Sequence, residues 1–146
     1  MQYRIMIGLA AALCAGSAVA QDIATKTGRI VAPAAGAGQV VFFRSGTMMG
    51  GALGCTVREG TAEVARLGAG KYHAVSVAPG QHAYTTSADS KDVLTLEVEP
   101  GETYYVQCKM GAGGLTYKPN LLPSDAAEFT KRAKGLAQWK GGIDKR

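Results

Sequence analysis

Apolar and polar residues alternate along most of the chain beyond residue 38, in short runs that glycine and proline interrupt. Alternation with a period of two gives an extended strand one apolar and one polar face, so each run predicts a half-buried β-strand. Seven or eight such runs predict an all-β domain, an antiparallel β-sandwich or barrel. The runs are residues 39–44, 53–59, 63–67, 72–78, 82–87, 93–98, 103–110 and 115–121.

Two Pro-Gly pairs, Pro79–Gly80 and Pro100–Gly101, mark turns, because a type II turn needs the fixed φ of proline followed by a positive φ. A two-residue turn at the first pair predicts a hairpin with Val77 opposite His82, which keeps the apolar residues on one face. The same turn at the second pair would place the apolar residues of its strands out of phase. That connection therefore predicts a bulge, a three-residue loop or a crossing between sheets.

The two ends of the domain break the alternation. Residues 21–38 are low in complexity and poor in large apolar groups, which predicts a flexible linker. Asp125 and Glu128 have the spacing of a helix capping box, and Phe129 begins an apolar stripe that continues at i+4 and i+7. We therefore expect a C-terminal helix that lies on the sheet. The expected organisation is a linker, a β-sandwich domain with its helix and a basic tail, at residues 21–38, 39–139 and 140–146.

The first twenty residues have the composition of an export signal. A short basic start is followed by an apolar run and by Ala18–Val19–Ala20. The run is too short to span a bilayer, and the small residues form a cleavage site of the A-x-A type. We expect residues 1–20 to be removed and the mature protein to begin at Gln21, in the periplasm or outside the cell. Leu13 precedes Cys14 where a lipoprotein signal needs a small residue, which argues against lipid anchoring.

Two cysteines remain in the mature chain, Cys55 and Cys108, and alternation places both on the inward faces of their strands. An exported protein folds in an oxidising compartment, so this pair predicts one disulfide. The alternative is two buried free thiols that pack as small hydrophobic groups.

The formal net charge of +5 is concentrated towards the C-terminus. Export separates the chain from nucleic acid, and basic and aromatic residues do not interleave on any strand face, so we expect no nucleic-acid partner. A basic helix near a tryptophan is typical of contact with anionic phospholipid, and a solvated helix face is the alternative. The candidate membrane-contact residues are Lys131, Arg132, Lys134, Trp139 and Lys140.

Motifs that carry chemistry are weak in this sequence. His73 and His82 could join the two cysteines in a Cys2His2 zinc set, but the expected hairpin would separate the histidines by roughly 13 Å. The sequence contains no G-x-S-x-G motif, and neither Ser45 nor Ser76 has a base close by in sequence. We therefore expect no catalytic residue, no metal and no cofactor.

Glycine-rich segments at residues 46–54 and 111–114 interrupt the strands. Neither is followed by the Gly-Lys-Ser/Thr of a phosphate-binding loop, and a β context lacks the helix N-terminus that such a loop uses. Flexible loops are the ordinary interpretation. Methionine makes adaptable apolar contacts, so Met48 and Met49 form the candidate binding loop.

Three stretches carry a family resemblance: residues 38–44 (GQVVFFR), 77–82 (VAPGQH) and 94–106 (LTLEVEPGETYYV). With them the chain resembles the bacterial family described as domain of unknown function 2846, over about residues 38–137. It resembles more loosely the prealbumin-like sandwiches that share the Pro-Gly turns. The resemblance implies a prealbumin-like or immunoglobulin-like sandwich exported to the envelope, often lipid-anchored, but these are strand and turn motifs and carry no chemistry.

Together these observations favour a non-catalytic cell-envelope module that binds a protein, a glycan or the anionic membrane surface. A small periplasmic hydrolase is the alternative. A cleft that holds a Ser–His or carboxylate pair within hydrogen-bond reach would favour the enzyme. A shallow surface with an apolar loop patch would favour the binding module.

Overall fold

A computed structural model describes residues 22–46, 54–86, 92–113 and 116–141 of the chain. The predicted signal peptide, the candidate binding loop at Met48 and Met49, and residues 142–146 of the basic tail lie outside this part. Within the described ranges, no helix is long and apolar enough to cross a membrane.

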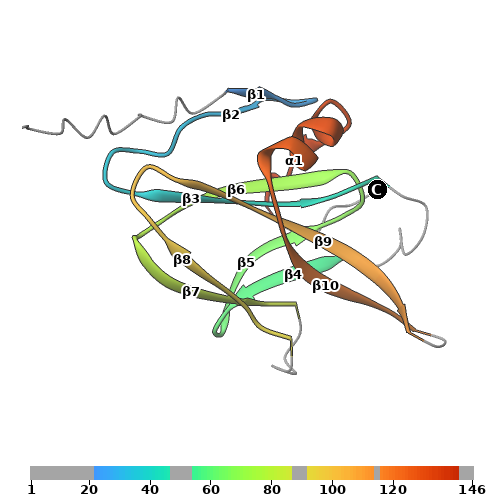
Figure 1. Cartoon of the computed structure of the whole chain (residues 1–146). Helices are drawn as coiled ribbons and strands as arrows, with labels where there is room; N and C mark the ends of the chain where they lie inside the picture. The colour runs from blue at the N-terminus through green and yellow to red at the C-terminus, as the bar shows by residue number, and fades with distance from the viewer. Residues whose placement is uncertain (1–21, 47–53, 87–91, 114–115, 142–146) are drawn as a thin grey trace, which may run out of the picture.

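The described chain folds into two facing β-sheets with a helix and a small hairpin on the outside (Figure 1). The strand order is β10-β9-β3-β6-β11 in one sheet and β5-β4-β7-β8 in the other, and β1 pairs with β2. The elements are β1 (Ile23–Ala24), β2 (Arg29–Ile30), β3 (Gly38–Arg44), β4 (Cys55–Glu59), β5 (Ala62–Leu67), β6 (Lys71–Val77), β7 (Gly80–Thr85), β8 (Leu94–Val98), β9 (Thr103–Gly113), β10 (Thr116–Ser124), α1 (Ala126–Ala133) and β11 (Ala137–Gln138). The prediction of an all-β sandwich with a C-terminal helix is therefore confirmed.

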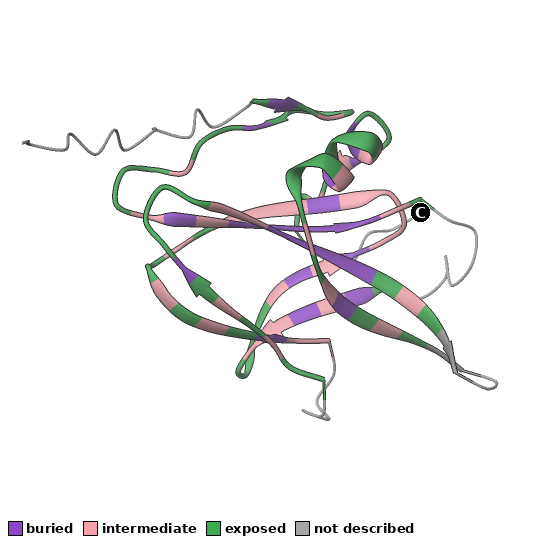
Figure 2. Ribbon diagram, in the orientation of Figure 1, coloured by how far each residue is buried: buried purple, intermediate pink, exposed green. Residues whose placement is uncertain are grey.

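The central strand β3 is buried on both faces, which its nearly continuous apolar sequence GQVVFFR explains (Figure 2). Val40 and Phe42 face the four-stranded sheet and belong to the core between the two sheets, which we call the inter-sheet core. Val41 and Phe43 face the other way and belong to a second cluster under the helix, which we call the helix-side core. The domain thus has three layers, with the five-stranded sheet in the middle.

Most strand pairs are antiparallel, as predicted, but β3 and β9 run parallel at the centre of the five-stranded sheet, as do β6 and β11 at its edge. The pairing of β3 with β9 places Phe43 opposite Gln107. This register brings the end of β3 beside the middle of β9, where the candidate site lies.

The prediction of a flexible linker over residues 21–38 is wrong for the part that the structure describes. Ile23 and Ile30, on the paired strands β1 and β2, are buried at 7% and 3% exposure in the helix-side core. The backbone N–H of Lys26 also donates to the carbonyl oxygen of Leu136, 3.0 Å away. Two large apolar residues and this hydrogen bond hold a segment whose composition alone predicts disorder.

The C-terminal helix begins as predicted, because a side-chain oxygen of Asp125 accepts the backbone N–H of Glu128 at 2.7 Å. Phe129 and Ala133 are buried, and Leu136, just beyond the helix, is 1% exposed. The ring of Phe129 contacts those of Phe43, Tyr72 and Tyr105 at centroid distances between 5.2 and 5.8 Å. This aromatic cluster joins α1 to the sheet.

The predicted hairpin at Pro79–Gly80 is wrong, because β6 and β7 belong to different sheets. Val77 pairs with Gly38, and His82 pairs with Leu96. An in-phase apolar pattern fits a sheet-to-sheet crossing as well as a hairpin, since the apolar faces of both sheets point into one core. The connection at Pro100–Gly101 also crosses between sheets, which confirms one of the three alternatives for it.

The predicted disulfide is confirmed: Cys55 on β4 is bonded to Cys108 on β9. Both residues are buried in the inter-sheet core, so the bond ties the two sheets together. The two cysteines are separated by 53 residues in sequence. Closing a loop of this length stabilises a domain by about 4 kcal/mol in the chain-entropy model.

Candidate functional site

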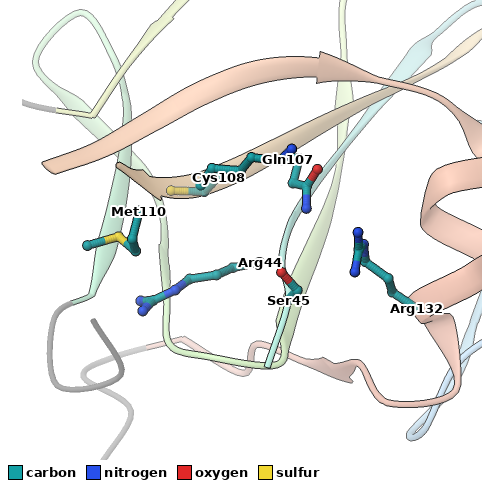
Figure 3. A pocket seen from close by; sticks show the side chains of 7 residues that line it. Arg44, Ser45, Gln107, Cys108, Met110 and Arg132 are labelled. Atoms are coloured by element: carbon teal, nitrogen blue, oxygen red, sulfur yellow. The ribbon is translucent and has the colours of Figure 1, made fainter. Parts of the chain in front are cut away.

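A pocket of about 290 Å³ opens where β3 ends, between β9 and α1 (Figure 3). In the close-up, Ser45 and Gln107 lie between the side chains of Arg44 and Arg132, and Met110 lies near the guanidinium group of Arg44. Three of the lining side chains are cationic, and none is a carboxylate. The lining residues are Arg44, Ser45, Gln107, Cys108, Lys109, Met110 and Arg132.

Arg44 is the last residue of β3 and is only 2% exposed. Its Nη1 donates to the carbonyl oxygen of Leu67, on β5, at 3.2 Å. A guanidinium group loses several kcal/mol of hydration when it is buried, so a buried arginine must be held by specific hydrogen bonds. Arg44 is therefore a fixed positive charge at the boundary between the two sheets.

Arg132 reaches the pocket from the last turn of α1. Its Nε donates to Oε1 of Glu128 at 3.1 Å, and Nζ of Lys131 lies 3.4 Å from the other oxygen. Both hydrogen bonds lower the pKa of Glu128 below its usual value, and the one from Arg132 has the larger effect. The carboxylate fixes the direction of Arg132 without lining the pocket itself.

The rest of the lining combines polar groups with an apolar wall. Gln107 is 4% exposed and supplies an amide, and Ser45 supplies a hydroxyl. Cys108, through the disulfide, and Met110 form an apolar side. Ser45 has no histidine or carboxylate beside it among these lining residues, so the pocket lacks the usual groups that activate a serine hydroxyl as a nucleophile.

A histidine–carboxylate pair lies in the four-stranded sheet, away from the pocket. Nδ1 of His82 is 2.7 Å from Oε1 of Glu59, and Nε2 is 2.7 Å from the carbonyl oxygen of Ala78. Both neighbours are acceptors, and only the imidazolium has two N–H donors. Both hydrogen bonds therefore raise the pKa of His82, and the one to the Ala78 carbonyl has the larger effect. With Nε2 bonded to the backbone, this pair has no nucleophile to activate.

The four residues of the hypothetical zinc set do not come together. His73 lies on β6, where its ring contacts that of Trp139 at 5.1 Å and burial lowers the pKa of His73, whereas His82 lies on the other sheet. Cys55 and Cys108 are bonded to each other. Within the part of the chain that the structure describes, no three His, Cys, Asp or Glu side chains are placed to hold one metal ion.

The candidate membrane-contact residues are divided between two faces of the five-stranded sheet. Lys131 and Arg132 lie on α1, which covers the helix-side core. Trp139 is half-buried and packs against the inter-sheet core, on the opposite face. Lys134 and Lys140 are exposed. The structure therefore separates the aromatic side chain from the cations of the helix.

Sequence reasoning missed the pocket, although one signal was present. Arg44 directly follows the four apolar residues 40–43, and Gln107 lies between Val106 and Cys108, which are both buried. A polar residue inside an apolar run indicates either a strand end or a buried polar site. The two residues are far apart in sequence, so only the pairing of β3 with β9 brings them together.

The chain matches no family model, and no curated protein or solved structure matches it either. The pocket is therefore interpreted from its own chemistry.

Proposed function

We propose that this protein is a non-catalytic binding module of the bacterial cell envelope, and that its partner is held at the basic pocket. The observation that carries the proposal is the buried charge of Arg44 on the pocket lining. Burying a guanidinium group costs stability, and apolar residues of similar volume often replace buried charges without loss. A cation in a partly open pocket is better explained by binding than by stability.

The hydrolase is the weaker candidate for two reasons. The carboxylate–histidine pair at Glu59 and His82 is bonded to a backbone carbonyl where a nucleophile would have to lie. Ser45, in the pocket, has no histidine or carboxylate among the described lining side chains. Catalysis by an activated serine needs the nucleophile, the base and the group that orients the base within hydrogen-bond reach of one another.

Export and family membership are part of the same proposal. The disulfide is compatible with an oxidising compartment outside the cytoplasm. We propose cleavage after Ala20, and membership of the family described as domain of unknown function 2846 on the strand and turn motifs. Mass analysis of the native protein tests the cleavage site: a mature form that begins at Gln21 is expected, and one that keeps Met1 contradicts export.

Photo-crosslinking in intact cells tests the binding site. A photoreactive amino acid replaces Met110, which is half-buried and lines the pocket without contributing a charge, or Thr95, which is exposed on β8 of the other sheet. Intact-mass analysis then detects protein, glycan or lipid adducts alike. A discrete adduct at position 110 that is absent at position 95 is expected. No adduct at either position, or the same adducts at both, would contradict the proposal.

A further inference from the structure

We propose that the pocket recognises one oxyanionic group, a carboxylate, phosphate or sulfate, carried on a small organic body. This inference rests on the proposed function, because it names the chemistry of what the pocket binds. Three observations support it: the lining is positively charged, both arginines are held by hydrogen bonds, and the pocket is small.

Three separate elements each contribute one cationic residue to the pocket lining. Arg44 comes from β3, Lys109 from β9 and Arg132 from α1, and none of the described residues that line the pocket is acidic. A concave site walled by protein concentrates the field of its charges, so three cations attract an anion there more strongly than they would on an open surface. We therefore expect the ligand to be an anion.

Both arginines are held before any ligand arrives. Arg44 is bonded to the Leu67 carbonyl oxygen, and Arg132 is bonded to Glu128 one helical turn away. Guanidinium groups form charge-assisted, often paired hydrogen bonds to the oxygens of carboxylate and phosphate groups. Because the side chains are already ordered, binding loses little of their conformational entropy.

The shape favours a small group over an extended surface. A volume of about 290 Å³ is close to the lower limit of small-molecule pockets. Arg44, at 2% exposure, lies too deep for a flat membrane surface to contact. Met110 and the Cys108 side of the disulfide offer apolar contact, while Gln107 and Ser45 offer hydrogen bonds, so the anionic group is expected to carry an organic body.

Titration of the full mature protein with simple oxyanions tests this directly. Backbone amide resonances are followed during addition of phosphate, sulfate or acetate at constant ionic strength. Saturable shifts centred on Ser45, Gln107 and Lys109 are expected. Comparison of acetate with phosphate and sulfate shows which oxyanion is preferred, and comparison of glucose 6-phosphate with glucose shows whether the body adds affinity to the charge.

Variants that differ by one charge make the test specific. Arg132→Gln and Lys109→Gln should each weaken the binding of the preferred oxyanion about tenfold, the loss expected for one charge-assisted hydrogen bond. Lys131→Gln is the matched control, because Lys131 bonds the same Glu128 but does not line the pocket, and it should change affinity less than about twofold. Arg44 is left intact, since its replacement would also remove the hydrogen bond to the buried Leu67 carbonyl oxygen and would mix an effect on folding with one on binding.

The outcomes separate this inference from the function it rests on. Shifts spread over all basic residues, equal losses in Arg132→Gln and Lys131→Gln, or no shifts at the pocket would each overturn the oxyanion site. If position 110 still forms its cross-link while no oxyanion binds, the pocket holds a partner of other chemistry. If both experiments fail, the proposed function fails as well.

Discussion

The inter-sheet core and the helix-side core share the five-stranded sheet but are built differently. Long strands form the inter-sheet core, and the Cys55–Cys108 disulfide crosses it. Short elements from the two ends of the described chain close the helix-side core, with Ile23 from one end and Phe129 and Leu136 from the other. Among the described residues, no disulfide crosses this second core.

The pocket lies where both cores end. On β9, Gln107 lies two residues beyond Tyr105, the residue of that strand in the helix-side core, whereas Cys108 faces the inter-sheet core. On β3, Arg44 follows Phe43, the last apolar residue of the helix-side core on that strand. The pocket therefore forms where apolar packing on both faces of the central sheet ends and polar side chains begin.

Removal of the disulfide should have the largest effect on stability. The double variant Cys55→Ala/Cys108→Ala should lose about 4 kcal/mol of unfolding free energy, because its unfolded chain regains the entropy of an open loop. Urea denaturation measures the loss, and wild type under reducing conditions should match the variant. A loss below about 1 kcal/mol would show that the inter-sheet core does not depend on the bond.

The aromatic centre of the helix-side core should come next. Phe129→Ala should lose about 3 kcal/mol, because it leaves a cavity among three aromatic rings. Thr130→Ala changes the exposed neighbour on the same helix and should stay within about 0.5 kcal/mol of wild type. Equal stabilities for the two variants, measured in urea, would show that the helix does not contribute to a core.

The N-terminal hairpin should contribute a smaller amount. Ile30→Ala should lose about 2 kcal/mol, since the residue is 3% exposed. Val31→Ala provides an adjacent control at 48% exposure and should have an effect below about 0.5 kcal/mol. Urea unfolding of both variants decides between a packed hairpin and the linker that the composition predicts. An Ile30→Ala variant as stable as wild type would instead support a flexible linker.

Replacement of the two histidines should have the smallest effects on stability, and the two effects should depend on pH in opposite directions. The pKa of His82 is raised in the folded state. Its contribution to the free energy of unfolding is therefore complete below about pH 6.5, the ordinary histidine pKa, and is lost as pH rises through the raised pKa. The pKa of His73 is lowered, so its contribution is complete above that value and is lost as pH falls towards the lowered pKa.

Unfolding free energies measured at about pH 5.5 and pH 8.5 test this pair. Compared with wild type, His82→Gln should lose more stability at the lower pH, by less than about 1 kcal/mol, because the ion pair with Glu59 is partly solvated. His73→Gln should lose more at the higher pH. The same pH trend in both variants would contradict the assigned hydrogen bonds of His82.

The strands and the disulfide could be predicted from sequence because alternation is local: Val57, Val106 and Cys108 reveal their buried face within a few residues. The hairpin prediction at Pro79–Gly80 failed because phase does not distinguish one sheet from two facing sheets. The helix-side packing of Ile30 depends on residues about a hundred positions away. The pocket could not be predicted for the same reason, since Arg44, Gln107 and Arg132 lie on three separate elements.

The most direct test of the pocket as the binding site combines the cross-linker at position 110 with single charge changes on α1. We predict that the adduct formed in intact cells disappears in Arg132→Gln and persists in Lys131→Gln, because only Arg132 lines the pocket. Equal adduct yields in the two variants would contradict the account.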